Sequence, residues 1–262
     1  MRVRKIAGVA CSCGLLVMAT VLLAAQAPKP AASQLFVANF VTVKSGMGPE
    51  YTAVQINEVM PAQKKAGAPG RQAWSSGVFG EAGGFAFFSP VTDMAQFDKE
   101  PPLRQALGEQ GAAALNAKTA QLTESRRTLL VRTRPDLSYE PNPGGAPAAL
   151  ALVTEVDVVP GRKGDFEAFL KKEVLPAMQQ AKVKGYSVLE VIYGDSVNGY
   201  ITAIGYDDYG SMGKGHPFQI ALGEEGARKL DAKVAGIVAH VNRFVARYRA
   251  DLSFSSAKPS SN

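Results

Sequence analysis

The chain has 262 residues, a formal net charge of +6 and two cysteines. Both cysteines, Cys11 and Cys13, lie near the N-terminus, so a chain that loses its first segment has no disulfide, no thiolate nucleophile and no cysteine metal ligand. The mild positive charge does not indicate binding to nucleic acid, and two domains of about 100 residues can each bury a sufficient core without disulfides.

Residues 1–27 have the three parts of a secretory signal peptide. These are a positive n-region (Arg2, Arg4 and Lys5), an apolar run (Leu15 to Ala25) and a small-residue cleavage motif (Ala25-Gln26-Ala27). Pro28 hinders a cut after Ala27, so cleavage after Ala25 is an alternative. Loss of this segment removes three cations and leaves a net charge of +3. We expect an exported protein, periplasmic or extracellular, without a stable membrane anchor. An uncleaved anchor and a lipid on Cys11 are less favoured alternatives.

The remainder of the chain contains an internal repeat. Stretches 35–139 and 150–254 align without a gap at an offset of 115 residues. The clearest match is LGEQGA from Leu107 against LGEEGA from Leu222, and both stretches end in the motif Asp-Leu-Ser followed by an aromatic residue. Two copies of this length are too few for a solenoid. The repeat therefore predicts two similar domains packed on a pseudo-two-fold axis.

Proline, glycine and polar residues mark the predicted boundaries. A leader covers 28–34, the first α+β repeat covers 35–139, and a Pro- and Gly-rich linker covers 140–148. The second α+β repeat covers 149–254, and a polar tail, expected to be disordered, covers 255–262.

Each repeat is predicted to have the element order β-α-β-β-α-β. In the first repeat the signals are strand Leu35–Val43, a helix opened by Gly48-Pro49, a turn at Gly83-Gly84, helix Leu107–Glu124 and strand Thr128–Arg134. In the second they are a helix with an apolar stripe from Phe166 to Ala181, a hairpin turn at Asn198-Gly199, helix Leu222–Asn242 and strand Phe244–Arg249. Pro61 and Pro176 lie inside the first helix of each repeat, where proline is expected to kink the helix.

This doubled element order resembles the dimeric α+β barrel group of the ferredoxin-like fold, which includes antibiotic-biosynthesis-monooxygenase-like, NIPSNAP-like and haem-degrading proteins. The resemblance covers nearly all of residues 35–254. It implies an α+β fold in which two ferredoxin-like βαββαβ repeats pack their antiparallel sheets into one pseudo-dimeric barrel. It also implies pockets between each sheet and its helices.

Candidate ligand-binding residues include Trp74 and His216. Haem-degrading members of the group use a histidine as iron ligand with a nearby asparagine and tryptophan. Here Trp74 lies in the repeat opposite His216, and no asparagine matches. The other histidine, His240, is expected within the second long helix. No metal-ligand spacing is visible, so neither a metal nor a cofactor is predicted, and Trp74 as sheet packing is the more favoured interpretation.

Repeated polar residues supply the other candidates. Arg132 and Arg134 alternate along the last strand of the first repeat, and Arg247 and Arg249 do so in the second, which places each pair on one face. A buried arginine needs a carboxylate or an anionic ligand. The candidate partners are Glu58, Glu173, Asp136 and Asp251. A structural ion pair is favoured over an anion site.

Three functions remain open on sequence alone. The favoured one is an exported, non-catalytic binding or interaction protein whose ligand is unknown; the partner considered is a small molecule and not nucleic acid. A structural protein of the envelope, without a small ligand, is a separate candidate. The alternative is a cofactor-independent, monooxygenase-like oxidative enzyme acting on a small molecule in a pocket between sheet and helices. An enclosed pocket with convergent polar groups favours the enzyme. The sequence does not define the oligomeric state.

The signal peptide generates a direct prediction. Mass spectrometry of the exported fraction should find a new N-terminus between about Gln26 and Gln34, because cleavage follows the small-residue motif. Recovery of only the intact chain, starting at Met1 and bound to membranes, would contradict export.

Overall fold

The computed structural model describes residues 32–256. The predicted signal peptide, most of the leader and the end of the tail therefore lie outside the described residues. No helix within 32–256 is long and apolar enough to cross a membrane.

The described chain forms two halves with the same element order. The first half contains β1 (Leu35–Val43), α1 (Gly48–Val54), η1 (Gln55–Val59), α2 (Met60–Lys65), β2 (Gly70–Ser76), β3 (Gly84–Val91), η2 (Met94–Asp98), α3 (Pro102–Leu122), β4 (Thr123–Thr133) and η3 (Pro135–Leu137). The second contains β5 (Leu150–Val158), α4 (Lys163–Phe169), η4 (Leu170–Val174), α5 (Leu175–Gln180), β6 (Tyr186–Tyr193), β7 (Gly199–Tyr206), α6 (Tyr209–Met212), α7 (Pro217–Val234), β8 (Val238–Tyr248), η5 (Ala250–Leu252) and β9 (Phe254–Ser255). Most elements of the second half begin at the predicted offset from their counterparts.

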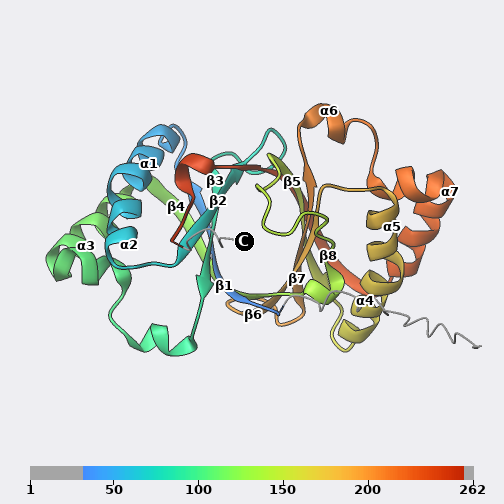
Figure 1. The fold of residues 1–262 in the computed structure, drawn as a ribbon, viewed down its shortest axis with the longest axis horizontal. Coiled ribbons are helices and arrows are strands. Elements are labelled where there is room, and N and C mark those ends of the chain that lie inside the picture. Colours follow the sequence, from blue (N-terminus) through green and yellow to red (C-terminus); the bar gives the residue numbers. More distant parts are fainter. Residues whose placement is uncertain (1–31, 257–262) are drawn as a thin grey trace, which may run out of the picture. The chain divides into compact units, whose positions relative to one another are not determined.

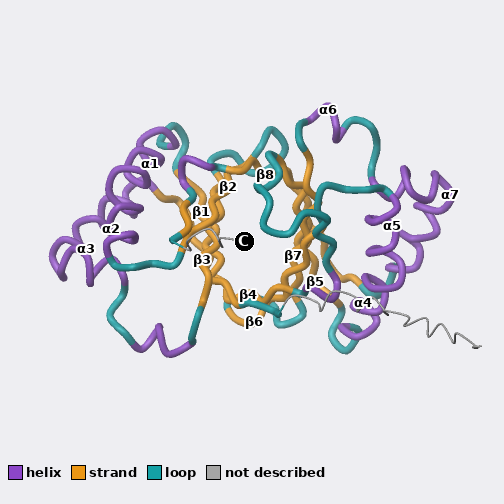
Figure 2. The backbone as a smooth tube through the Cα atoms, viewed as in Figure 1, coloured by secondary structure: helices purple, strands orange, loops and turns teal. Residues whose placement is uncertain are grey.

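The eight long strands close into one antiparallel barrel, which confirms the predicted fold class. Their order is β3-β1-β4-β6-β7-β5-β8-β2, and a further pairing of β2 with β3 completes the ring. The halves join at two seams, where β4 pairs with β6 and β8 pairs with β2. Figures 1 and 2 show the strands in the centre and the helices of the two halves on opposite outer sides.

Alternation along each strand separates two kinds of core. On β1, Val41 and Val43 pack under the helices of the first half, whereas Ala38 faces the barrel interior with Phe36 and Phe40. The second half has its own core between sheet and helices, which includes Val156, Val158 and Phe166. A smaller cluster that includes Leu129, Val131, Val191 and Ile201 fills the barrel interior. The barrel therefore has three apolar cores, one inside it and one between the sheet and the helices of each half.

The end of each half packs into the other half. Leu137, in η3, belongs to the core of the second half and is 1% exposed, and Leu252, in η5, belongs to the core of the first half and is 0% exposed. The serine after each leucine fixes this position, since Ser138 Oγ accepts from the backbone N–H of Val188 and Ser253 Oγ accepts from that of Ala73. The repeated Asp-Leu-Ser motif is thus a crossing segment.

Pro61 and Pro176 each lie inside a helical stretch, as predicted. Each proline follows a π-helical turn, η1 or η4, and the helix continues through it. The N–H of Met60 bonds to the carbonyl of Gln55, five residues back. Because proline lacks an N–H and clashes with the carbonyl four residues before it, a wide turn is a natural accommodation.

The second helix of each half begins earlier than predicted and ends sooner. Both helices bend at a glycine with positive φ, Gly108 (72°) in α3 and Gly223 (71°) in α7. The last strands begin at Thr123 and Val238, so His240 lies in β8 and the prediction that it lies in a helix is wrong. The first part of each of these strands is exposed, so it lacks the alternation that marks a half-buried strand.

Candidate functional site

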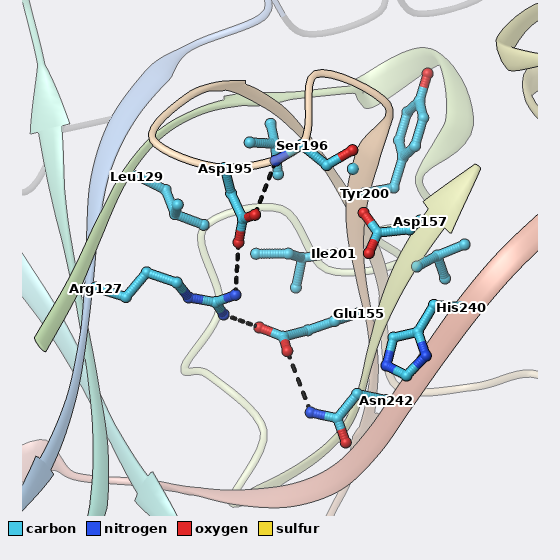
Figure 3. Close-up of a pocket in the computed structure, with 13 residues that line it drawn as sticks. Arg127, Leu129, Glu155, Asp157, Asp195, Ser196, Tyr200, Ile201, His240 and Asn242 are labelled. Carbon is cyan, nitrogen blue, oxygen red and sulfur yellow. Dashed lines mark hydrogen bonds and ion pairs between the residues drawn. The ribbon is translucent and has the colours of Figure 1, made fainter. Parts of the chain in front are cut away.

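A polar cavity of about 200 Å³ lies at one mouth of the barrel, beside the β6–β7 hairpin (Figure 3). Its polar lining residues are Arg127, Glu155, Asp157, Asp195, Ser196, Tyr200, His240 and Asn242. Its apolar lining residues are Leu129, Val156, Val191 and Ile201, with Gly199 at the turn. Three carboxylates, a guanidinium, an imidazole and an amide thus converge over an apolar floor.

Strand alternation places these side chains at the mouth. Glu155 and Asp157 are two residues apart on β5, and His240 and Asn242 are two residues apart on β8. Each of these pairs therefore shares a face of the sheet. Arg127 is two residues before Leu129, which belongs to the barrel interior. The hairpin loop contributes Asp195, whose carboxylate accepts a hydrogen bond from the backbone N–H of Ser196.

Arg127 is the centre of the charge pattern. Its guanidinium contacts the carboxylates of Glu155 and Asp195, the latter at 2.8 Å, and lies 4.8 Å from the ring centroid of Phe40. Glu155 also accepts a hydrogen bond from the side-chain amide of Asn242 at 3.2 Å. Arg127 belongs to the first half and Glu155 to the second, so this contact connects the halves at the barrel mouth.

Asp157 and His240 are direct cross-strand neighbours in the pairing of β5 with β8. Side chains at such positions have Cβ atoms about 5 Å apart. Figure 3 shows both on the side of the cavity opposite Arg127. An imidazole beside a carboxylate is the arrangement that general bases use, because the carboxylate orients the ring and stabilises its protonated form.

The cavity draws residues from both halves, but three of its ionisable side chains have no ionisable counterpart in the first half. At equivalent positions of the first half, Phe40 replaces Glu155, Thr42 replaces Asp157 and Ser125 replaces His240. Sequence reasoning looked for polar residues that both repeats share and so passed over these residues. The signal that could have found them is a difference between the repeats: a strand position that faces the barrel interior and is charged in one repeat only.

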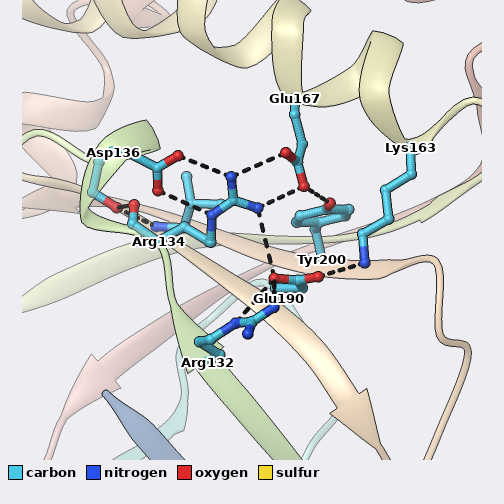
Figure 4. Close-up of polar contacts among 9 residues, drawn as sticks. Arg132, Arg134, Asp136, Lys163, Glu167, Glu190 and Tyr200 are labelled. Atoms are coloured by element: carbon cyan, nitrogen blue, oxygen red, sulfur yellow. Dashed lines mark hydrogen bonds and ion pairs between the residues drawn. The ribbon is translucent and has the colours of Figure 1, made fainter. Parts of the chain in front are cut away.

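Two of the four predicted arginines, Arg132 and Arg134, form a second polar cluster on the helix side of the barrel (Figure 4). Arg132 bonds to Glu190 at 2.8 Å, and Arg134 bonds to Asp136 at 2.9 Å and to Glu167 at 2.5 Å. Glu190, 5% exposed at its side chain, also contacts Lys163 and lies 3.6 Å from Arg134. Of these partners only Asp136 was predicted. The arginines belong to the first half and both glutamates to the second, so the cluster joins the halves.

These contacts set the ionisation of the cluster. Hydrogen bonds from Arg134 hold the pKa of Asp136 and of Glu167 below the usual carboxyl range. Burial raises the pKa of Glu190, but Lys163 and Arg132 outweigh it and the net direction is downward. Burial, together with its hydrogen bond to Glu167, raises the pKa of the Tyr200 phenol. All three carboxylates are therefore ionised at neutral pH, and Tyr200 is a neutral donor.

The remaining predicted site residues lie apart from both clusters. Trp74 packs edge-on against Tyr248 at the β2–β8 seam, with 5.2 Å between ring centroids. His216 caps α7, where its Nδ1 accepts from the N–H of Phe218, and burial lowers its pKa. Arg247 lies 5.9 Å from the ring of Tyr209. These three residues line neither the cavity at the barrel mouth nor a second cavity on the outer side of the first half, and their role as ligand-binding residues stays a prediction.

Glu58 and Glu173 do not pair with the arginines. Glu58 bonds to Lys118 at 2.5 Å, and Glu173 bonds to Lys233 at 2.6 Å, so each ties a π-turn to the long helix of its own half. Arg249 bonds to Asp251 at 2.7 Å, as the same-face spacing predicts.

Buried side chains occupy the space between sheet and helices in the first half. Arg71 is 4% exposed; its Nε donates to the carbonyl of Leu252, a second nitrogen donates to Gln55, and its guanidinium lies 4.7 Å from the ring centroid of Phe87. Burial lowers the pKa of Arg71 to about 10. Arg71 holds the crossing segment of the second half in place.

Within residues 32–256, no three histidine, cysteine, aspartate or glutamate side chains come together as metal ligands would. The prediction that the protein needs no metal or cofactor stays a prediction.

The second cluster generates a pH-dependent prediction. Arg134→Met should lower the free energy of unfolding by about 3 kcal/mol at pH 7, because it leaves Glu190 and Glu167 with fewer counter-charges. A carboxylate with a lowered folded-state pKa stabilises the fold above its ordinary pKa of about 4, and this contribution disappears as the pH falls through the folded pKa. The loss should therefore shrink at about pH 3.5. Urea unfolding at both pH values measures it.

The matched control is Arg249→Met, at the equivalent position of the other half. Its one carboxylate partner within the described residues is Asp251, which is 47% exposed at its side chain. We expect a loss of about 1 kcal/mol or less. Equal losses for the two variants, or a loss that does not change with pH, would contradict the assignment.

Comparison with known proteins supports the fold. No protein-family model matches the chain, and no curated protein sequence matches it. Among solved structures, the chain is similar to an anthrone oxidase-like protein (14% identity, TM-score 0.59, covering 86% of this chain and 94% of that one). It is also similar to proposed monooxygenases from Fusobacterium nucleatum (12%, TM-score 0.54, covering 83% and 93%) and Lactobacillus acidophilus (10%, TM-score 0.52, covering 86% and 97%). The chain thus has the dimeric α+β barrel fold, with both halves of the barrel in one polypeptide.

Proposed function

We propose that the protein is an oxidative enzyme that binds a neutral, hydroxylated aromatic molecule at the barrel mouth and oxidises it with molecular oxygen. The observation that carries this proposal is the convergence of Asp157, His240, Asn242 and Arg127 on one cavity with an apolar floor. Such a combination of apolar surface and a few polar groups is typical of small-molecule sites.

The charges of the cavity select the ligand. The carboxylates of Glu155, Asp157 and Asp195 outnumber the guanidinium of Arg127, so the cavity favours a ligand that enters uncharged and whose hydroxyl groups donate hydrogen bonds. Leu129, Val191 and Ile201 offer the apolar surface on which an aromatic ring packs. A phenol or an enolisable aromatic ketone has both features.

The side chains supply the acid–base part of the chemistry. His240, the cross-strand neighbour of Asp157, removes a proton from the substrate hydroxyl or from an activated C–H, and Asn242 and Arg127 donate hydrogen bonds to the oxygen on which charge develops. The electron-rich anion then reacts with O2 at carbon and forms a hydroperoxide. For a substrate with an activated ring CH2, such as an anthrone, the hydroperoxide forms at that carbon after uptake of a proton, and loss of water then gives C=O. One O2 is consumed and one water is released for each substrate.

The likeness to an anthrone oxidase-like protein and to proposed monooxygenases supports this reading through fold alone. The N-terminal sequence supports a location outside the cytoplasm, in the periplasm or beyond the cell.

A non-catalytic binding protein is the second candidate. One observation favours it: Arg127, Glu155, Asp195 and Asn242 already contact one another. A site whose charged side chains already pair with one another can bind a ligand without promoting a reaction.

Oxygen uptake tests the proposal. With a dihydroxyanthrone as probe, the exported form should consume oxygen, and His240→Gln should lower kcat/KM by about a hundredfold or more, because it removes the base. Ser125→Ala, at the equivalent position of the other half, should leave the rate unchanged.

The outcomes separate the two candidates. Binding of the probe without oxygen uptake would replace the enzyme with the binding protein. An equal rate for the wild-type protein and His240→Gln would exclude His240 as the base. Absence of both binding and uptake for a series of phenols and anthrones would overturn the assignment of this cavity.

A further inference from the structure

A second cavity lies on the outer side of the first half, away from the barrel mouth. It is a trough of about 490 Å³ between the η1–α2 helix and α3. This volume is in the range of about 300–1,000 Å³ that is typical of small-molecule sites. The apolar part of its lining consists of Pro61, Ala62, Leu107, Gly111, Ala114 and Leu115.

The sequence keeps this trough open. Small residues, Ala62 on one helix and Gly111 and Ala114 on the other, stand where larger side chains would interdigitate. Leu107 precedes the bend at Gly108 and is 41% exposed. A Cβ at Gly111 would lie 2.9 Å from the Cβ of Leu107, so glycine is required there for Leu107 to take this position.

The two ends of the trough carry different charges. At one end Lys118 is neutralised by Glu58. At the other end Lys65 donates to the backbone carbonyl of Ala106 at 2.9 Å, and it has no carboxylate partner among residues 32–256. An ammonium group has three N–H donors, so Lys65 keeps donors for an anion beside an apolar surface.

The second half provides a natural comparison. There Gln180 replaces Lys65 and donates to the carbonyl of Ala221, the same contact without the charge. Lys229 replaces Ala114 and pairs with Glu225. In the second half, the equivalent pair of helices therefore lacks two features of the trough: the lysine without a carboxylate partner at the position of Lys65 and the small residue at the position of Ala114.

We propose that the trough of the first half binds a long-chain carboxylate, such as a fatty acid, with its head group on Lys65 and its chain along Leu107, Ala114 and Leu115. The charge of Lys65 selects an anionic head, and the apolar floor between the two helices selects a hydrocarbon chain. The site is separate from the barrel-mouth cavity and does not depend on the function proposed for that cavity.

Calorimetric titration with decanoate, below its micelle concentration, tests the proposal. The wild-type protein should bind it saturably. Lys65→Gln should bind it about tenfold more weakly or worse, since loss of a hydrogen bond to a charged group weakens binding by at least about this factor. Because Gln180 makes the equivalent contact in the other half, this variant should fold normally. Decanol, which has no charge, should bind the wild-type protein and Lys65→Gln equally.

Two further variants make the test decisive. Ala114→Lys copies the second half and should abolish binding of both probes, whereas Lys229→Ala, in the other half, should leave the affinity for decanoate unchanged. Equal decanoate affinity in Lys65→Gln and wild type would remove the head-group assignment. Unchanged binding in Ala114→Lys, or no binding to the wild-type protein, would overturn the site. Oxygen uptake at the barrel mouth should be the same in all three variants.

Discussion

The structure depends on the exchange of the terminal segments between its two halves. Leu137 and Leu252, fully buried, each complete the core of the opposite half. The following residues extend the exchange, since Tyr139 bridges to Tyr186 and Phe254 pairs with Arg71. Without this exchange each half would lose a core leucine, which costs about 2–5 kcal/mol when truncated to alanine, and would expose unpaired strand edges. The barrel is therefore the folding unit, and the repeat is a part of it.

A symmetric scaffold holds asymmetric chemistry. Several ion pairs that support the two halves occur twice: Arg134 with Asp136 and Arg249 with Asp251, and Glu58 with Lys118 and Glu173 with Lys233. The groups that suit ligands occur once. His240 and Asp157 lie in the second half, and the carboxylate-free Lys65 lies in the first. In a doubled chain, one copy of a position can keep the fold while the other acquires a charge, so differences between the repeats are the better guide to function.

The sequence predicts the fold well and the site poorly, for identifiable physical reasons. Strand Leu35–Val43 and the turn at Gly199 carry strong local signals, because β-branched residues and Asn-Gly have few other conformations available to them. The start of β8 at Val238 carries no such signal, because the strand is exposed there, and His240 was therefore assigned to a helix. Glu155 and Arg127 are far apart in sequence and meet only across the closed barrel, which no local pattern encodes.

Cleavage of the linker tests the central claim most directly. Residues 140–148 are almost entirely exposed, so a protease site introduced there can be cut in the folded chain. The exchanged segments predict that the two fragments stay together as one particle in gel filtration at micromolar concentration and unfold in a single transition. Separation into two folded monomers that do not rebind would show that each half completes its own core, and would contradict the account.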